Sequence, residues 1–173
     1  MSTISAGFIH PHSIHPKIQV DVSGHQAKGC SLHLFLRTND KLFFDPYELE
    51  DSWRPSGASL GGHDDITSWD LVPAVPDLER PVKYGYKASK ETHNETTVEN
   101  ELHVELLWRS TRSLQVLVPT HARYQQPDES GYREIRISAV DSRQTNFEKD
   151  VDVRALWNCR QEDSSIGQSS TCF

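Results

Sequence analysis

The sequence predicts an all-β fold, a single antiparallel β-sandwich domain with long polar loops. At least six segments alternate apolar and polar residues with a period of two, which places one side chain in a core and the next outside it. No segment shows a persuasive helical period of 3.6 residues, and no internal repeat is visible. The length of 173 residues suits one domain with a real core. Together these features favour two antiparallel sheets packed face to face.

The first predicted strands occupy residues 18–22 and 31–36. In both, apolar residues take every second position and therefore share one face. His33 lies alone on the opposite face of the second strand, so we expect an exposed strand residue and not a metal ligand. Residues 41–44 form a short apolar run that ends in a turn.

Four more strands are predicted in the second half of the chain, in residues 102–108, 113–124, 132–140 and 151–155. Only a short polar connection separates the first two, so we expect them to pair as an antiparallel hairpin. The last strand precedes Trp157, where we place the end of the domain.

The chain divides into three predicted regions: a disordered N-terminal arm in residues 1–17, the domain in residues 18–157, and a polar C-terminal tail in residues 158–173. The arm contains His10, His12 and His15, and three close histidines can hold a metal. Two prolines among them and the lack of a nearby acidic or thiol partner favour a solvated tail. The sequence therefore predicts no metal site and no cofactor.

Residues 52–90 have the composition of a long loop, because prolines and glycines are frequent there. Trp53 and Trp69 lie within this polar stretch. An aromatic residue in a polar loop either plugs the rim of a β-sandwich or contacts a sugar or a partner, and we favour the plug.

The charge balance excludes one class of partner. The formal net charge is −7, from 25 acidic and 18 basic residues, and no basic run offsets it. A protein that binds nucleic acid needs a basic face to neutralise phosphates, so we expect no nucleic-acid partner.

Cys30 precedes a predicted strand and Cys159 follows the last one, so they are candidates for a disulfide in an oxidising compartment. A buried thiol beside an exposed one is the alternative, because spacing alone does not set connectivity. No Cys-x-x-Cys pair exists, which disfavours the familiar structural zinc sites. Asn94 begins an Asn-Glu-Thr acceptor for N-glycosylation in the most polar stretch of the chain.

The first of two informative segments consists of Asp45, Pro46, Tyr47, Glu48 and Leu49. Pro46 presets φ and Asp45 can accept from the backbone N–H two residues on, which predicts an Asx-type turn. Asp45 and Glu48 can also be interpreted as paired carboxylates for acid–base or glycosyl chemistry. The sequence offers neither a second acidic pair nor a cleft signal, so we favour the turn over catalysis.

The second segment ends an apolar strand with five spaced residues: Pro119, His121, Arg123, Tyr124 and Pro127. A catalytic His121 needs a nucleophile or an activated water, and the sequence has neither a Gly-x-Ser-x-Gly elbow nor a His-Glu-x-x-His helix. We therefore expect His121 to be partly buried and bonded to a carboxylate or carbonyl, with Arg123 paired to Asp128 or Glu129.

Together with Ser130-Gly131-Tyr132, the two segments resemble the PIG-X family and its fungal Pbn-type relatives. That family carries Phe-x-Asp-Pro-Tyr-Glu-Leu and, downstream, Pro-x-His-x-Arg-Tyr-x-x-Pro. The resemblance is clearest in residues 32–51 and 113–137, and we see none before about residue 17 or after about residue 157.

The resemblance implies a non-catalytic subunit of the endoplasmic-reticulum mannosyltransferase that adds the first mannose to the glycosylphosphatidylinositol (GPI) precursor. It also implies a partner, the polytopic catalytic subunit PIG-M, which members of the family stabilise. They present a luminal β-rich domain held by one membrane helix. The resemblance supplies no catalytic role for the motif residues and implies a structural or partner-docking role for them.

The chain departs from this pattern because no stretch of about 20 apolar residues follows Trp157, and residues 1–10 show no ordinary secretory signal. We expect a luminal domain at the endoplasmic-reticulum membrane, attached through its partner or through an anchor missing from this chain. The alternatives are a soluble carbohydrate- or protein-binding β-sandwich that acts alone, and a hydrolase that uses His121 with a distant carboxylate.

Overall fold

The computed structural model describes residues 3–24, 30–39, 41–53, 65–72, 100–108, 113–124, 135–139 and 150–159, together with the backbone of residues 170–172. These residues are mostly in β-strands and include one short helix. The predicted all-β class is confirmed.

The smaller of the two main sheets has three strands in the order β1-β2-β7. They are β1 (Thr3–Ile9), β2 (Lys17–Ser23) and β7 (Ser113–Pro119). Both pairs are antiparallel, and β2 lies in the centre.

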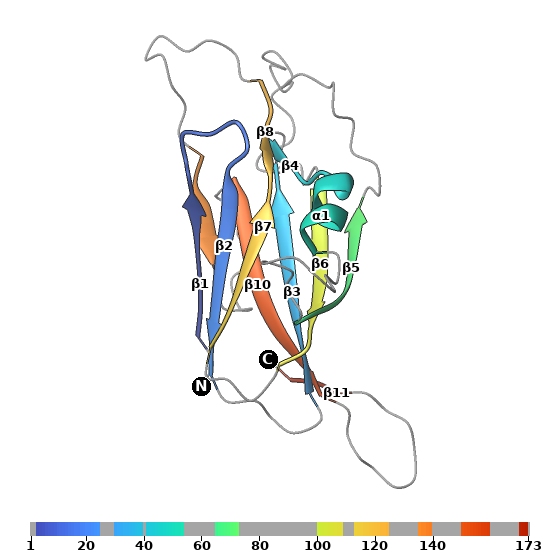
Figure 1. The fold of residues 1–173 in the computed structure, drawn as a ribbon. Helices are drawn as coiled ribbons and strands as arrows, with labels where there is room; N and C mark the ends of the chain where they lie inside the picture. The colour runs from blue at the N-terminus through green and yellow to red at the C-terminus, as the bar shows by residue number, and fades with distance from the viewer. Residues whose placement is uncertain are drawn as a thin grey trace, which may run out of the picture.

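The larger sheet runs in the order β11-β10-β3-β6-β5. Its strands are β11 (Ser170–Cys172), β10 (Val151–Cys159), β3 (Cys30–Thr38), β6 (Asn100–Leu106) and β5 (Ile66–Val72). These neighbours are antiparallel, whereas β9 (Ile137–Ala139) pairs with β10 in parallel. The two sheets form the two layers of a sandwich (Figure 1).

The core lies between these layers because each central strand buries every second residue. The inward faces of β2 and β3 contribute fully or almost fully buried side chains: Ile18, Val20, Val22, Leu32, Leu34 and Leu36. Burying one such side chain stabilises the fold by about 1.5–3 kcal/mol. Burial of the apolar residues that alternate in the sequence therefore stabilises the packing of the two sheets.

A two-stranded ladder and the helix lie near one end of the sandwich (Figure 1). The ladder pairs β4 (Leu42–Phe43) with β8 (His121–Ala122), and α1 spans Pro46–Trp53. Leu49 and Trp53 are buried and lie four residues apart, on one face of the helix. Burial of this face attaches α1 to the core.

Asp45 caps the N-terminus of α1. Its Oδ1 accepts from the backbone N–H of Tyr47 at 2.9 Å, and its carbonyl accepts from that of Leu49 at 2.9 Å. Pro46 takes the first helical position, where a missing N–H costs no hydrogen bond. The Asx-type turn predicted from the sequence is therefore the start of a helix that the sequence analysis did not foresee.

The prediction of a disordered N-terminal arm is wrong for Thr3–Ile9, which forms β1 along the whole of β2. Ile4, Ala6 and Phe8 are partly buried and pack against the core. The spacing of these apolar residues at every second position is the pattern of a strand, but the prolines and histidines that follow gave the region a loop-like composition.

The predicted hairpin is also wrong. β6 pairs with β3 and β5, whereas β7 pairs with β2 in the other sheet. A short connection permits a crossing between layers as well as a hairpin, and the apolar faces of β6 and β7 both contribute to the common core. The segment predicted as one strand in residues 113–124 is divided at Thr120 into β7 and β8.

Two regions predicted as loop or tail contain strands. β5 lies inside residues 52–90, and its pairing with β6 needs an irregularity between Ile66 and Ser68. β10 continues past Trp157 to Cys159, and β11 pairs with that extension. Edge strands of this kind carry weak alternation, because a sheet edge tolerates polar residues on both faces.

Candidate functional site

The two segments singled out in the sequence lie against each other in the structure. In the β4–β8 ladder, Leu42 pairs with Ala122 and Phe43 with His121. Next to it, the N–H of Arg123 donates to the carbonyl of Lys41 at 2.8 Å. The Arg123 guanidinium lies 4.8 Å from the centre of the Phe43 ring, a cation–π contact, and the side chain is buried.

His121 lies beside both carboxylates of the first segment. Its Nε2 is 2.5 Å from Glu48 Oε2 and 3.8 Å from Asp45 Oδ2. The His121 ring also stacks on Phe43, with ring centres 5.0 Å apart. Only 18% of the His121 side chain is exposed, so the bond to Glu48 joins β8 to the first turn of α1 in a partly dry environment.

A third segment reaches the same place through His15. Extending the β2–β7 register by two residues brings His15 opposite His121, and the ring centres lie 4.3 Å apart. One ligand atom from each of His15, Glu48 and His121 lies within 4.8 Å of the other two. The sequence analysis placed His15 in a solvated tail, because the acidic partner comes from a segment distant in the chain.

The remaining residues of the two segments divide into inward and outward groups. Leu49 and Pro119 are buried, whereas Tyr47 is 73% exposed and Tyr124 is 90% exposed. Ile14, which precedes His15, is 65% exposed. Each segment thus combines buried residues that build the frame with one aromatic side chain directed to solvent. Pro127, Asp128, Glu129 and Asn94 lie outside the described residues.

A second polar cluster lies on the outer face of the larger sheet. His33 Nδ1 is 2.8 Å from His103 Nε2, and His33 Nε2 is 2.8 Å from Ser31 Oγ. Burial and the neighbouring His103 lower the pKa of His33, and the charge of Glu105 raises it by less. The His103 ring stacks on Phe35 with centres 4.5 Å apart. These contacts stabilise cross-strand pairs of β3 and β6.

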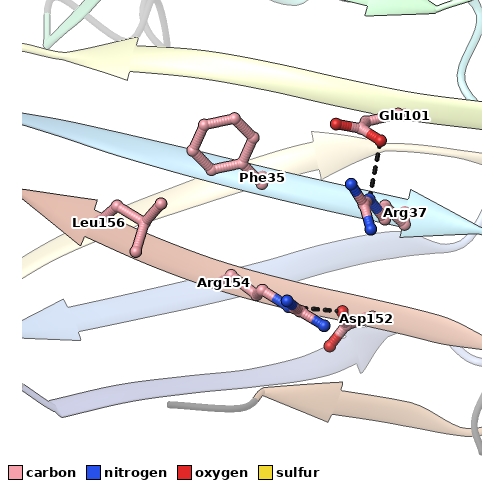
Figure 2. A pocket seen from close by; sticks show the side chains of 6 residues that line it. All are labelled: Phe35, Arg37, Glu101, Asp152, Arg154 and Leu156. Atoms are coloured by element: carbon pink, nitrogen blue, oxygen red, sulfur yellow. Dashed lines mark hydrogen bonds and ion pairs between the residues drawn. The ribbon is translucent and has the colours of Figure 1, made fainter. Parts of the chain in front are cut away.

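A shallow pocket of about 200 Å³ lies on the same face and is shown in Figure 2. Phe35 and Leu156 line one side of it and two ion pairs line the other, Arg37 with Glu101 at 2.7 Å and Arg154 with Asp152 at 2.9 Å. Each arginine is therefore bonded to a carboxylate of the same sheet, which reduces its availability to an acidic ligand.

The two tryptophans bear on the carbohydrate-binding alternative. Trp53 is 4% exposed, and its Nε1 donates to the carbonyl of Leu117 at 3.1 Å. Trp69 is partly buried on β5 and meets Trp53 edge to face, with ring centres 6.3 Å apart. The two rings pack between the end of α1 and β5, which matches a plug and does not form an exposed platform for a sugar.

Cys30 and Cys159 lie directly opposite each other in the β3–β10 pair, and a disulfide of 2.12 Å joins their sulfurs. Among the described residues, no helix has the length and apolar character needed to span a membrane.

Comparison with known protein families gives a match. The family described as PIG-X / PBN1 matches residues 11–169, a wider range than the resemblance carried by the two motif segments. Neither the curated proteins nor the solved structures gave a match. The match extends over most of the chain and includes the segments that meet at His121. The chain therefore belongs to the PIG-X / PBN1 family, whose role is that of a subunit of the mannosyltransferase complex in GPI-anchor biosynthesis.

Proposed function

We propose that this protein is a non-catalytic subunit that binds and stabilises the PIG-M-type catalytic subunit of the mannosyltransferase, from the luminal side of the endoplasmic-reticulum membrane. One observation carries the proposal: each of the two motif segments presents one exposed tyrosine on a frame that the segments build together. Membership of the family and the glycosylation acceptor at Asn94 support the location and the type of partner.

We call the end of the sandwich that carries Ile14, Tyr47 and Tyr124 the tyrosine end. Tyrosines are enriched in the energetically important centres of protein interfaces, because a rigid ring buries a large area at a small entropic cost. The frame beneath them is held by the β4–β8 ladder and by the bond from His121 to Glu48. A rigid frame loses little entropy on binding, which favours a docking role.

The mechanism is mass action. A partner that binds only the folded form of the catalytic subunit stabilises that form and raises its abundance without taking part in sugar transfer. In this proposal the polar residues at His121 shape the docking surface and do no chemistry on the sugar.

The test is co-expression of this chain with the PIG-M-type subunit, followed by co-precipitation and measurement of the level of the catalytic subunit. We expect the wild-type chain to capture the subunit and raise its level, and the Tyr47→Ala/Tyr124→Ala variant to lose at least tenfold in capture, about 1.4 kcal/mol. Its thermal unfolding should be unchanged, because both side chains are exposed.

Leu107→Ala is the matched control, since Leu107 is 48% exposed just beyond the end of β6. This variant should capture the catalytic subunit as well as the wild type does. Equal capture by the double tyrosine variant would refute docking at the tyrosine end, and absence of capture by the wild type would refute the proposed partner.

A further inference from the structure

Two imidazoles and a carboxylate from three separate segments converge beside the β4–β8 ladder. The ligand atoms of His15, Glu48 and His121 lie within 4.8 Å of one another. Imidazole nitrogen and carboxylate oxygen suit zinc, and two histidines with one glutamate form an established zinc ligand set. Calcium and magnesium prefer oxygen ligands alone. We propose that His15, Glu48 and His121 bind a zinc ion, with water completing its coordination.

The backbone already holds His15 in place for this role. The carbonyl of Ile14 accepts from the N–H of Ala122 at 2.9 Å, and the carbonyl of Pro16 accepts from the N–H of Thr120 at 3.1 Å. One bond lies on each side of the His15–His121 pair, so the two histidines are held opposite each other. Thr120 Oγ1 adds a bond of 2.6 Å to the same Pro16 carbonyl. A preorganised pair loses little entropy when the metal binds.

Pro16 also restricts the residue before it. The helical region is disfavoured for a residue that precedes proline. His15 lies at a bend in the connection between strands, directly before Pro16 and β2. Its backbone N–H donates to Ser13 Oγ at 3.0 Å, which orders the turn just before it.

The bond between His121 and Glu48 marks the position that the metal would take. Nε2 and Oε2 lie 2.5 Å apart with one proton between them, and zinc binding would replace that proton. Zinc bonds of 2.0–2.2 Å in a tetrahedral arrangement separate two ligand atoms by roughly 3.3–3.6 Å. The Glu48 side chain is 32% exposed and lies in the first turn of α1, so a small rotation opens the required space.

The charge of the site suits a dication. Asp45 Oδ2 lies 3.8 Å from His121 Nε2, so a second carboxylate adjoins the three proposed ligands. Two carboxylates balance the charge of one zinc ion, and the nearby negative charge of Asp45 favours its binding. The same carboxylate accepts from the Tyr47 N–H through its other oxygen, which fixes its orientation.

A bound zinc ion would join the β1–β2 connection, the first turn of α1 and β8. Ile14 and Tyr47 lie in the first two of these segments and Tyr124 follows β8 by two residues, so the metal would stiffen the tyrosine end. Zinc binding needs no partner, and its test is independent of the capture experiment.

The test uses the full 173-residue chain, freed of metal with EDTA, and titrates it with zinc chloride by calorimetry. We expect one zinc per chain, and a rise in Tm of about 5–10 °C at free zinc one hundred times the dissociation constant. His15→Ala should weaken zinc binding at least tenfold while leaving the Tm in EDTA unchanged, because the His15 side chain is exposed. Glu48→Gln should also weaken zinc binding.

His12→Ala is the matched control, because His12 is exposed in the same connection and is not one of the three proposed ligands. It should bind zinc as the wild type does. The proposal is overturned if the wild type shows no binding up to about 1 mM zinc. It is equally overturned if His15→Ala binds as tightly as the wild type, or if His12→Ala weakens binding as much as His15→Ala.

Discussion

Asp150, just before β10, accepts hydrogen bonds from three residues that lie in two other segments. Its Oδ1 accepts from Lys41 Nζ at 2.6 Å and from Asn39 Nδ2 at 2.7 Å, and its Oδ2 accepts from the N–H of Arg136 at 2.8 Å. Burial raises the pKa of Asp150, but these hydrogen bonds and the charge of Lys41 together lower it below the ordinary value. The carbonyl of Lys41 in turn accepts from Arg123, so this carboxylate supports the ladder that carries His121.

Asp150→Asn should reduce the free energy of unfolding at pH 7 by about 1.5–3 kcal/mol, the usual contribution of hydrogen bonds to a charged group. The pKa of Asp150 is lower in the folded state than in the unfolded chain. Its contribution is therefore present above the unfolded pKa, near 3.9, and is lost as the pH falls through the folded pKa. Urea unfolding should show that the difference in free energy of unfolding between the wild type and Asp150→Asn is smaller at pH 3 than at pH 7.

Asp70→Asn serves as the control for this substitution, because Asp70 is exposed on β5. It should change the free energy of unfolding by less than about 0.5 kcal/mol at pH 7. An equal advantage of wild type over Asp150→Asn at both pH values would show that the ionised carboxylate is not the cause.

The eight residues of helix α1 include both buried side chains that pack in the core and a side chain exposed to solvent. Its inner face carries Leu49 and Trp53, which pack against the core, and its outer face carries Tyr47. Glu48 lies between these faces and reaches His121. The same helix thus anchors itself to the sandwich, holds β8 and presents one of the two tyrosines.

Trp53→Ala should cost about 3–5 kcal/mol of stability, because it opens a cavity and removes the donor to the Leu117 carbonyl. Tyr47→Ala on the same helix should cost less than about 0.5 kcal/mol, since its side chain is 73% exposed. Chemical denaturation of both variants measures the difference. Similar losses in the two variants would contradict the assignment of an inner and an outer face.

The disulfide cross-links the neighbouring strands β3 and β10 at the end of the larger sheet where β3 begins and β10 ends. Cys30 and Cys159 are 129 residues apart in sequence, so the bond restricts most of the unfolded chain. The smaller sheet shares the core with β3 and β10, which couples both layers to this cross-link. In a luminal setting such a bond persists, because the compartment is oxidising.

The Cys30→Ala/Cys159→Ala variant should lose about 2–4 kcal/mol of stability in urea unfolding under oxidising conditions. Dithiothreitol should lower the stability of the wild type by a similar amount and leave the variant unchanged. Cys172→Ser is the control and should unfold as the wild type does, with the same response to the reductant. Unchanged stability of the wild type in dithiothreitol would count against a structural role for this bond.

The strands with clear alternation were predictable because a period of two reports burial directly. Residues 18–22 and 31–36 became the central strands β2 and β3, where one face is fully buried. Edge strands were less predictable, since β1 and β5 bury less of each face. Sheet partners could not be derived at all, because several antiparallel arrangements bury the same apolar faces.

Composition, alternation and two short motifs were enough to predict an all-β chain and its family, and they singled out the two segments that meet at one end of the sandwich. The meeting of His15, Glu48 and His121 depended on the folded arrangement, because their segments are far apart in the chain and join only through the β2–β7 register and the β4–β8 ladder. Local sequence controls which face of a strand is apolar. Long-range packing controls which polar side chains then meet.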